Sequence, residues 1–352
     1  SDLFMIRKTL WSMVLACAIT LPASNAFADS VELNPNHPQR YTVVKGDTLW
    51  GISERFLNDA WRWPDVWHVN QHIKNPHLIY PGDEIELTYV DGEPQLRLHR
   101  GGNNGVVKLS PHIRESELDT AIPTIPLDAI KQFLLHPEVM NADEMDSAPY
   151  VVAFPGTRQL AGSGDRAYVR TIETKQTKNF VIFEPGNALI DPDTKEILGY
   201  EAHYRGDAKL QKAGDPATVK IIRSVQEVSV GDRLRPSTNE EVMTHFQPHA
   251  PKEKINGYII GVTDGVVNIG QFNTVVINKG TADNIEVGHI FNVWQRGDVI
   301  SDVVSKNPHD KVQLPDEKAG YLMVYKTFDR VSYALVMKAV LEMQTLDKIS
   351  TP

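Results

Sequence analysis

The sequence has a single cysteine, Cys17, among its 352 residues. That cysteine lies in an apolar run near the amino terminus, ahead of every stretch that reads as a folded domain. We expect this region to be removed on export, which leaves a folded chain without a disulfide or a thiol nucleophile. Disulfide-stapled domains and cysteine hydrolases are therefore excluded.

Long apolar runs are also scarce. The run from Leu10 to Leu21 has roughly 12 residues, fewer than the ~20 that a membrane-spanning helix needs. It follows a basic stretch at Arg7 and Lys8 and precedes an A-x-A sequence that ends at Ala28, which is the pattern of a cleavable export signal. We predict a signal peptide over residues 1–28, with residues 1–4 outside the native start, cleavage after Ala28, and a periplasmic location peripheral to the outer membrane and the cell wall. Lipidation at Cys17 is the open alternative.

The sequence has no excess of basic residues. The formal net charge is -9, and removal of residues 1–28, which contain Asp2, Arg7 and Lys8, changes it to -10. An acidic chain is poorly suited to bind phosphate backbones, so no nucleic-acid partner is expected.

Motifs of the common hydrolases are missing as well. The chain has no G-x-S-x-G sequence, no phosphate-loop lysine and no histidine pair of a wall-cutting metallopeptidase. A pair of glycosidase carboxylates stays open, because sequence alone does not place carboxylates in space. We predict a protein that is not an enzyme and needs no cofactor, with a cell-wall hydrolase as the less favoured alternative.

What the sequence does contain, from about residue 150 onward, is short runs rich in Val, Ile, Tyr and Phe between turn residues. They are AYVRTI, NFVIFEPG, ATVKIIRSV, YIIGVTDG, TVVINKG, HIFNVWQRG, GYLMVYKTF and SYALVMKAV. Runs of this length between Gly, Asp and Asn are typical of antiparallel β structure. We predict an α+β chain whose carboxyl-terminal part is mostly β, as small barrels or sandwiches.

Composition divides the rest of the chain. We predict a linker at 29–40, a first domain at 41–88, a connecting segment at 89–149 with a short helix at 126–135, a β-rich domain at 150–235, a linker at 236–254 and a second β-rich domain at 255–345. The second linker carries three prolines and no strand-like run.

The first domain reads as strand, helix, helix, strand. YTVV alternates as a short strand, Gly46 allows a turn, and Asp47 or Thr48 can cap a helix that Leu49, Ile52 and Phe56 define by their spacing. A second helix is predicted over 65–71, and PGDEIEL supplies a turn and a closing strand.

YTVVKGDTLWGIS and NPHLIYPGDEIEL together resemble the LysM module. The resemblance implies binding of glycan that contains N-acetylglucosamine, which in a periplasm is peptidoglycan. By position, the glycan groove lies between two loops, and its predicted residues are Gly46, Asp47, Thr48, Leu49, Asn75, Pro76, His77, Leu78 and Ile79. Asp47 has an equal alternative role as a helix cap.

Several other residues invite a site. Trp61, Trp63 and Trp67 could stack on sugars, but in so small a domain we favour packing in the core. His68, His72 and His77 do not complete a metal pattern, and no metal is predicted. Asp191–Glu196 and Gly162–Asp165 are predicted to be turns rather than calcium or phosphate loops.

A second resemblance extends over most of residues 106–340. VVKLSPHIR, AIPTIPLDAI, GSGDRAYVR, DPDTKEILGYEAHYRGDA and VQEVSVGDRLRP are similar to the type IV pilus secretin-associated family, and VVINKGTADNIEVGHIFNVWQ with AGYLMVYKTFDRVSYALVM is similar to the carboxyl-terminal domain of flagellar assembly protein T. The resemblance implies an accessory that anchors the outer-membrane pilus secretin to peptidoglycan. Its partner surface would lie within residues 150–345, in multiple copies around an oligomeric channel. A general LysM envelope protein without a pilus role is the alternative.

Overall fold

The computed structural model describes residues 31–67, 78–100, 121–125, 138–172, 177–237, 246–262, 269–305, 307 and 309–352. The predicted signal peptide with Cys17, the helix expected at 126–135, and His68, His72 and His77 lie outside these residues. Among the described helices, none is long and apolar enough to cross a membrane.

The first part of the chain, residues 31–67 and 78–99, forms the amino-terminal module. Its elements are β1 Arg40–Thr42, α1 Leu49–Phe56, η1 Ala60–Arg62, α2 Trp63–Val66, β2 Glu84–Val90 and β3 Glu93–His99. The strands form an antiparallel sheet in the order β1-β2-β3. The strand β3 lies in the stretch that was expected to be a connecting segment.

Helix α1 begins and ends where the sequence predicts. Leu49, Ile52 and Phe56 are buried on one face, and the Thr48 hydroxyl accepts the Gly51 N–H at 3.0 Å as an N-cap. Residues ahead of β1 pack on this helix, because Leu33 pairs with Leu57 and the Asn34 N–H donates to the Phe56 carbonyl. This part of the expected 29–40 linker therefore belongs to the folded module.

A seven-stranded antiparallel sheet follows, in the order β10-β7-β5-β12-β8-β9-β4, with β10 also paired to β9. Its strands are β4 Glu138–Met140, β5 Tyr150–Ala153, β7 Arg166–Arg170, β8 Asn179–Ile190, β9 Ile197–Lys212, β10 Ala217–Ser224 and β12 Arg233–Pro236. Helix α4 Ala142–Ser147 and the pair β6 Leu160–Ala161 with β11 Val228–Ser229 accompany the sheet. The predicted turn at 191–196 joins β8 to β9, with the Asp191 N–H donating to the Glu196 carbonyl at 2.9 Å.

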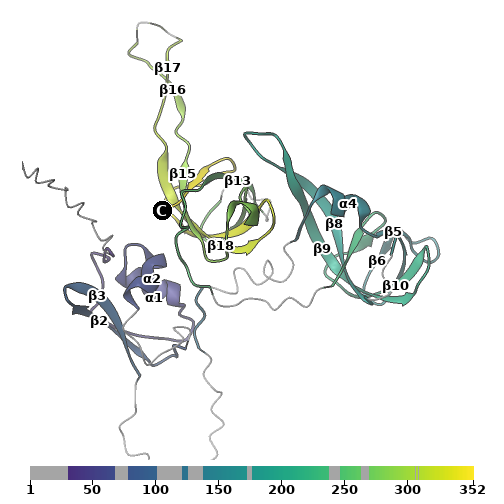
Figure 1. Cartoon of the computed structure of the whole chain (residues 1–352), viewed down its shortest axis with the longest axis horizontal. Helices are drawn as coiled ribbons and strands as arrows, with labels where there is room; N and C mark the ends of the chain where they lie inside the picture. Colours follow the sequence, from purple (N-terminus) through teal and green to yellow (C-terminus); the bar gives the residue numbers. More distant parts are fainter. Residues whose placement is uncertain are drawn as a thin grey trace, which may run out of the picture. The chain divides into compact units, whose positions relative to one another are not determined.

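The last part of the chain closes into a six-stranded barrel, in the order β13-β14-β19-β18-β15-β20 with β20 paired to β13 (Figure 1). Its elements are β13 Asn256–Val262, β14 Thr274–Ile277, η2 Thr281–Asp283, β15 Ile290–Gln295, β18 Glu317–Thr327, β19 Ser332–Ala339 and β20 Lys348–Ser350. The mostly-β carboxyl-terminal part with a small barrel, predicted from the short apolar runs, is confirmed. Closure leaves the barrel without a free sheet edge.

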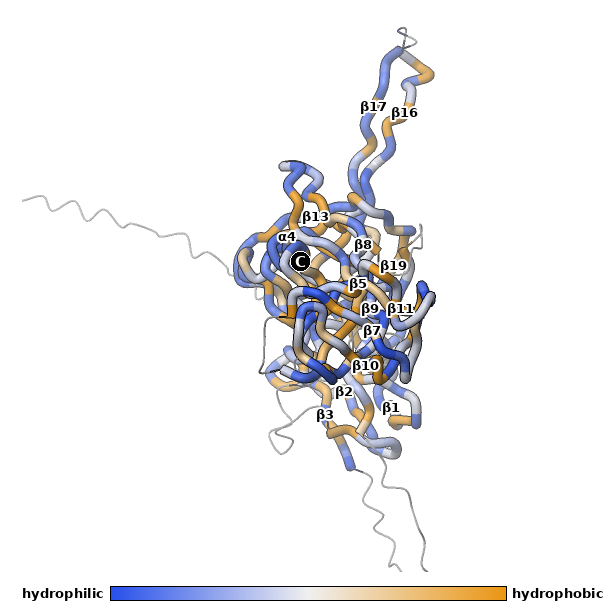
Figure 2. Tube along the Cα trace, turned by 90° about the vertical axis from the view of Figure 1, so that its right-hand side faces the viewer, coloured by the Kyte–Doolittle hydropathy of each residue, from blue (hydrophilic) through white to orange (hydrophobic). Residues whose placement is uncertain are grey.

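A two-stranded hairpin extends from the barrel between β15 and β18 (Figure 1). Its strands are β16 Val299–Ser301 and β17 Lys311–Gln313, and we call residues 299–313 the arm. Hydrophobic residues are visible along it (Figure 2). Val303 and Val304, at the tip, are 92% and 88% exposed.

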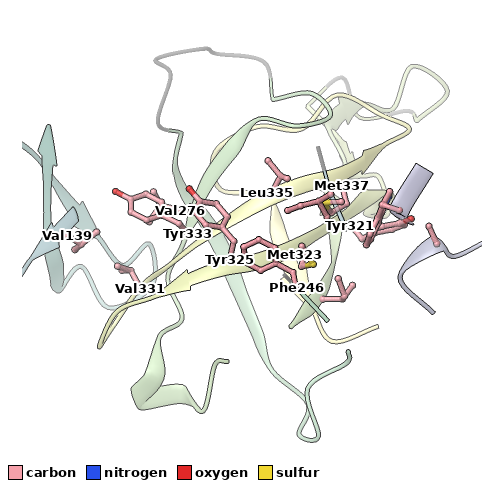
Figure 3. Packing of buried hydrophobic residues seen from close by; sticks show 14 of the residues in the cluster. Val139, Phe246, Val276, Tyr321, Met323, Tyr325, Val331, Tyr333, Leu335 and Met337 are labelled. Atoms are coloured by element: carbon pink, nitrogen blue, oxygen red, sulfur yellow. The ribbon is translucent and has the colours of Figure 1, made fainter. Parts of the chain in front are cut away.

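The barrel strands carry apolar side chains on both faces. Inside, Phe291, Leu322 and Val336 belong to one buried cluster. On the opposite face of β18 and β19, a second cluster includes Tyr321, Met323, Tyr325, Tyr333, Leu335 and Met337 (Figure 3). Tyr325 and Tyr333 stack there with ring centroids 6.3 Å apart. Because both faces are buried, these strands read as continuous apolar runs rather than as an alternating pattern.

One turn recurs through the chain. In four Gly-Asp turns the glycine has a positive φ, and the Asp side chain accepts the backbone N–H three residues earlier. The donor and acceptor pairs are Val44 and Asp47, Tyr80 and Asp83, Gly162 and Asp165, and Ser229 and Asp232, at 2.8–3.0 Å. The turn predicted at 162–165 is one of them. Glycine tolerates this backbone conformation and aspartate supplies the missing acceptor.

We predict that Phe291→Ala lowers the free energy of unfolding by about 3–5 kcal/mol, because the ring is fully buried in the barrel. Ile300→Ala in the arm is the control, since Ile300 is 45% exposed, and its effect should stay within about 0.5 kcal/mol. Urea unfolding measures both. Equal losses for the two variants would contradict this description of the core.

Candidate functional site

The candidate glycan site is built on the first Gly-Asp turn. The Asp47 carboxylate accepts the Val44 N–H at 2.9 Å and the Tyr41 hydroxyl at 2.9 Å. Asp47 therefore holds the turn, and Thr48 caps the helix. The sequence left Asp47 or Thr48 as the helix cap, and the structure assigns the cap to Thr48.

Tyr41, which donates to Asp47, is itself affected by its surroundings. Burial raises the pKa of Tyr41, and its hydrogen bond to Asp47 raises the pKa further. The Arg55 guanidinium lies over the Tyr41 ring at 4.6 Å from the centroid. The Tyr41 side chain is thus held at its hydroxyl by Asp47 and at its ring by Arg55.

The second predicted loop is described only in its last two residues. Leu78 is 42% exposed and Ile79 is fully buried, and Asn75, Pro76 and His77 lie outside the described residues. In the first loop Gly46 is exposed, whereas the Leu49 side chain is buried. Side chains of Leu49 and Ile79 thus support the fold, and only their backbone groups could reach a ligand.

Those backbone groups have partners within the chain. A segment distant in sequence, residues 121–125, runs against both loops. The Leu49 N–H donates to the Pro123 carbonyl at 3.0 Å, and the Trp50 N–H donates to the Thr124 carbonyl at 2.9 Å. We call residues 121–125 the strap.

The strap also pairs with the second loop. The Ile122 N–H donates to the Ile79 carbonyl at 2.8 Å, and Ile122 is 5% exposed within the core of the module. A neighbouring carbonyl, that of Leu78, accepts from the Arg100 guanidinium at 3.3 Å. Sequence reasoning missed the strap, because nothing in AIPTI marks it as a partner of a loop more than 40 residues away.

Two of the three tryptophans considered above, Trp63 and Trp67, pack in the core of the module, as predicted. Trp63 and Trp67 are 1% and 6% exposed, and their rings meet edge to face at 6.5 Å. Trp61 is partly buried. Sugar stacking on Trp63 or Trp67 would require the core to open.

One cluster in the described residues has metal-ligating side chains, His249, Glu286 and His289, with ligand atoms within 4.8 Å of one another. A backbone bridge holds the two histidines side by side, and their ring centroids are 4.8 Å apart. His249 Nδ1 lies 3.0 Å from the Gln247 carbonyl, so a proton there leaves Nε2 free as a ligand.

His289 has the opposite tautomer. Its Nδ1 accepts the Glu286 N–H at 3.1 Å, which puts the proton on Nε2. Gly288 before it has φ +98°, so residues 286–289 form the same turn as the four Gly-Asp turns with histidine in place of aspartate. The hydrogen bond from the Glu286 N–H to Nδ1 gives His289 a role in the turn. A metal at Nε2 would displace the proton to Nδ1 and so break this hydrogen bond.

Comparison with known proteins identifies the amino-terminal module. Residues 41–88 match the LysM domain family. A relative from Bacillus subtilis (strain 168), "Uncharacterized protein YqbP", is 37% identical over 60 residues. The match covers 14% of this chain and 27% of that protein, so the chain spans about a quarter of the relative's length. The LysM match indicates peptidoglycan or carbohydrate binding and a module that binds rather than catalyses.

We predict that Asp47→Ala destabilises the module by about 0.5–1.5 kcal/mol, because the Val44 N–H and the Tyr41 hydroxyl lose their shared acceptor. Asp47→Asn keeps an acceptor oxygen and should cost clearly less. Thermal unfolding followed by the fluorescence of the buried tryptophans measures both variants. If the two variants were equally stable, the turn would not depend on this acceptor.

We predict a pH dependence from His289. Burial lowers the pKa of His289, the nearby His249 lowers it further and Glu286 opposes the shift. The unfolded chain therefore takes up the proton first, near pH ~6.5. The stabilisation from neutral His289 is complete above that pH and is lost as the pH falls through the folded-state pKa.

His289→Asn separates this effect from the turn itself, since its amide oxygen can accept the Glu286 N–H. We expect the wild type to lose more unfolding free energy between about pH 7.5 and pH 5.5 than His289→Asn does, as measured by urea unfolding. Parallel losses would show that His289 does not titrate in this range.

Proposed function

We propose that this chain is a non-catalytic protein of the cell envelope that binds peptidoglycan through residues 41–88 and holds the outer-membrane type IV pilus secretin to the wall. The LysM match carries the first half of the proposal. The second half is supported by the sequence resemblance of residues 106–340 and by the exposed apolar arm on the barrel.

The glycan groove is proposed between Gly46–Leu49 and the loop that ends at Leu78 and Ile79. Exposed Gly46 and Leu78 offer surface, and the backbone N–H and C=O groups of the loops suit the acetamido groups of a neutral sugar. A shallow groove of this kind binds weakly, and a dissociation constant near ~1 mM corresponds to about -4 kcal/mol. Retention on the wall then depends on several copies held together.

The secretin surface is proposed on the β-rich part, with the arm as its most exposed element. A two-stranded hairpin has two unpaired edges and is marginally stable alone in water. Val299, Ile300 and Val312 are 44–56% exposed along the strands, and the two tip valines are more so. A β-rich partner can pair with such an edge and cover these side chains.

The location proposed for this function is the periplasm, after export and cleavage following Ala28. LysM domains occur typically in cell-envelope proteins, which supports a wall-facing place. Copies arranged around an oligomeric channel would supply the multivalency that a weak glycan site needs.

We predict that the chain from residue 29 to residue 352 sediments with purified peptidoglycan and leaves the peptidoglycan intact. Leu78→Asp should weaken retention at least about tenfold, the equivalent of ~1.4 kcal/mol. Tyr89→Asp is the matched control, because Tyr89 is 58% exposed near the far end of β2. Unchanged retention of Leu78→Asp would remove the groove proposal, and release of soluble sugars would favour the hydrolase alternative.

The same chain, used as bait in outer-membrane extract, is expected to capture the secretin. Val303→Asp with Val304→Asp should reduce capture, since both tip side chains would carry charge into the interface. Val340→Asp is the control, at 61% exposed on the same barrel. Wall binding without secretin capture would leave a general LysM envelope protein.

A further inference from the structure

The strap uses the backbone groups on which the proposed groove depends. Leu49 and Trp50 are the first two residues of α1, so their N–H groups have no acceptor inside the helix. The carbonyls of Pro123 and Thr124 accept these two hydrogen bonds. The Ile122 N–H donates to the Ile79 carbonyl on the opposite loop. One five-residue segment thereby bridges both walls of the groove.

The chemistry of the strap is that of the ligand. A peptide unit and an acetamido group present the same C=O acceptor and N–H donor. A glycan would bind here by pairing its acetamido groups with the Leu49 N–H, the Trp50 N–H or the Ile79 carbonyl. These groups already form hydrogen bonds with the strap. Both cannot occupy the same N–H and C=O groups at once.

The strap is held by backbone hydrogen bonds and by buried side chains. In the described residues, three backbone hydrogen bonds join it to the two loops, and Ile122, Thr124 and Ile125 are 5%, 1% and 0% exposed. Arg100 adds a similar cover over the Leu78 carbonyl. A glycan that uses the same backbone groups must displace these side chains together with the hydrogen bonds.

We propose that residues 121–125 form an internal occupant of the LysM groove, which peptidoglycan glycan must displace in order to bind. The inference rests on the proposed function, since it concerns the same groove. Its consequence is a reduced apparent affinity, because the intrinsic affinity is scaled by the fraction of chains whose groove is open. Any contact that draws the strap away would strengthen wall binding.

The test uses the chain from residue 29 to residue 352 with a soluble pentamer of N-acetylglucosamine as the probe. Amide hydrogen exchange, resolved by residue, is measured without probe and at about ten times its dissociation constant. We expect the Ile122 N–H to exchange at least about tenfold faster with the probe bound, because it loses the Ile79 carbonyl. The Leu49 and Trp50 N–H groups should remain protected, since the sugar replaces the strap.

Variants give an independent readout. Ile122→Ser keeps the backbone of the strap and removes its buried side chain, so the probe should bind at least about threefold more tightly. Ile300→Ser in the arm is the matched control and should bind as the wild type does.

The outcomes separate the two proposals. If the probe binds while the Ile122 N–H keeps its protection, the strap is a fixed part of the fold and this inference fails, whereas glycan binding stands. If neither the wild type nor Ile122→Ser binds the probe, although tryptophan fluorescence shows both to be folded, glycan binding itself fails. An affinity of Ile122→Ser no higher than that of Ile300→Ser also overturns the inference.

Discussion

The amino terminus of α1 needs acceptors for backbone N–H groups that the helix itself cannot satisfy, and the candidate site depends on how this need is met. The Thr48 hydroxyl accepts the Gly51 N–H, and strap carbonyls accept the N–H groups of the two preceding residues, Leu49 and Trp50. An N–H group that points out of a helix end can donate to any carbonyl oxygen of suitable geometry, from the chain or from a sugar. The N–H groups whose hydrogen bonds to the strap stabilise the module are therefore also suited to recognise a sugar carbonyl.

The Gly-Asp turns meet the corresponding need in the loops. Each puts a glycine at positive φ and returns a carboxylate to an N–H that would otherwise lack a partner. Residues 286–289 solve the same problem with an imidazole, which holds the turn only while Nδ1 is unprotonated. The fold thus tolerates either acceptor, but only histidine makes the turn sensitive to pH near neutrality.

The proposed glycan site and the proposed partner surface would complement each other physically. Shallow backbone recognition of a neutral sugar gives little free energy for each copy, and a proposed internal occupant lowers it further. A ring of copies on an oligomeric partner compensates through effective concentration. The closed barrel has no free edge of its own, whereas the two strands of the arm pair only with each other and leave two edges unpaired.

The sequence by itself determined the local elements. Helical spacing with Asp47 or Thr48 as the cap predicted α1, and short apolar runs predicted eight of the strands in the two β-rich regions, β7, β8, β10, β13, β14, β15, β18 and β19. The paired blocks around Gly46 and Gly82 predicted the LysM module. These features follow from neighbours within a few residues, where periodicity and turn chemistry act. Tertiary structure alone decided the closure of the barrel, the seating of the strap against Leu49 and Ile79, and the meeting of His249 with His289. Such contacts join residues 40 or more positions apart. Local propensity does not determine which distant carbonyl will accept a given N–H, or which distant ring will pack against a given side chain.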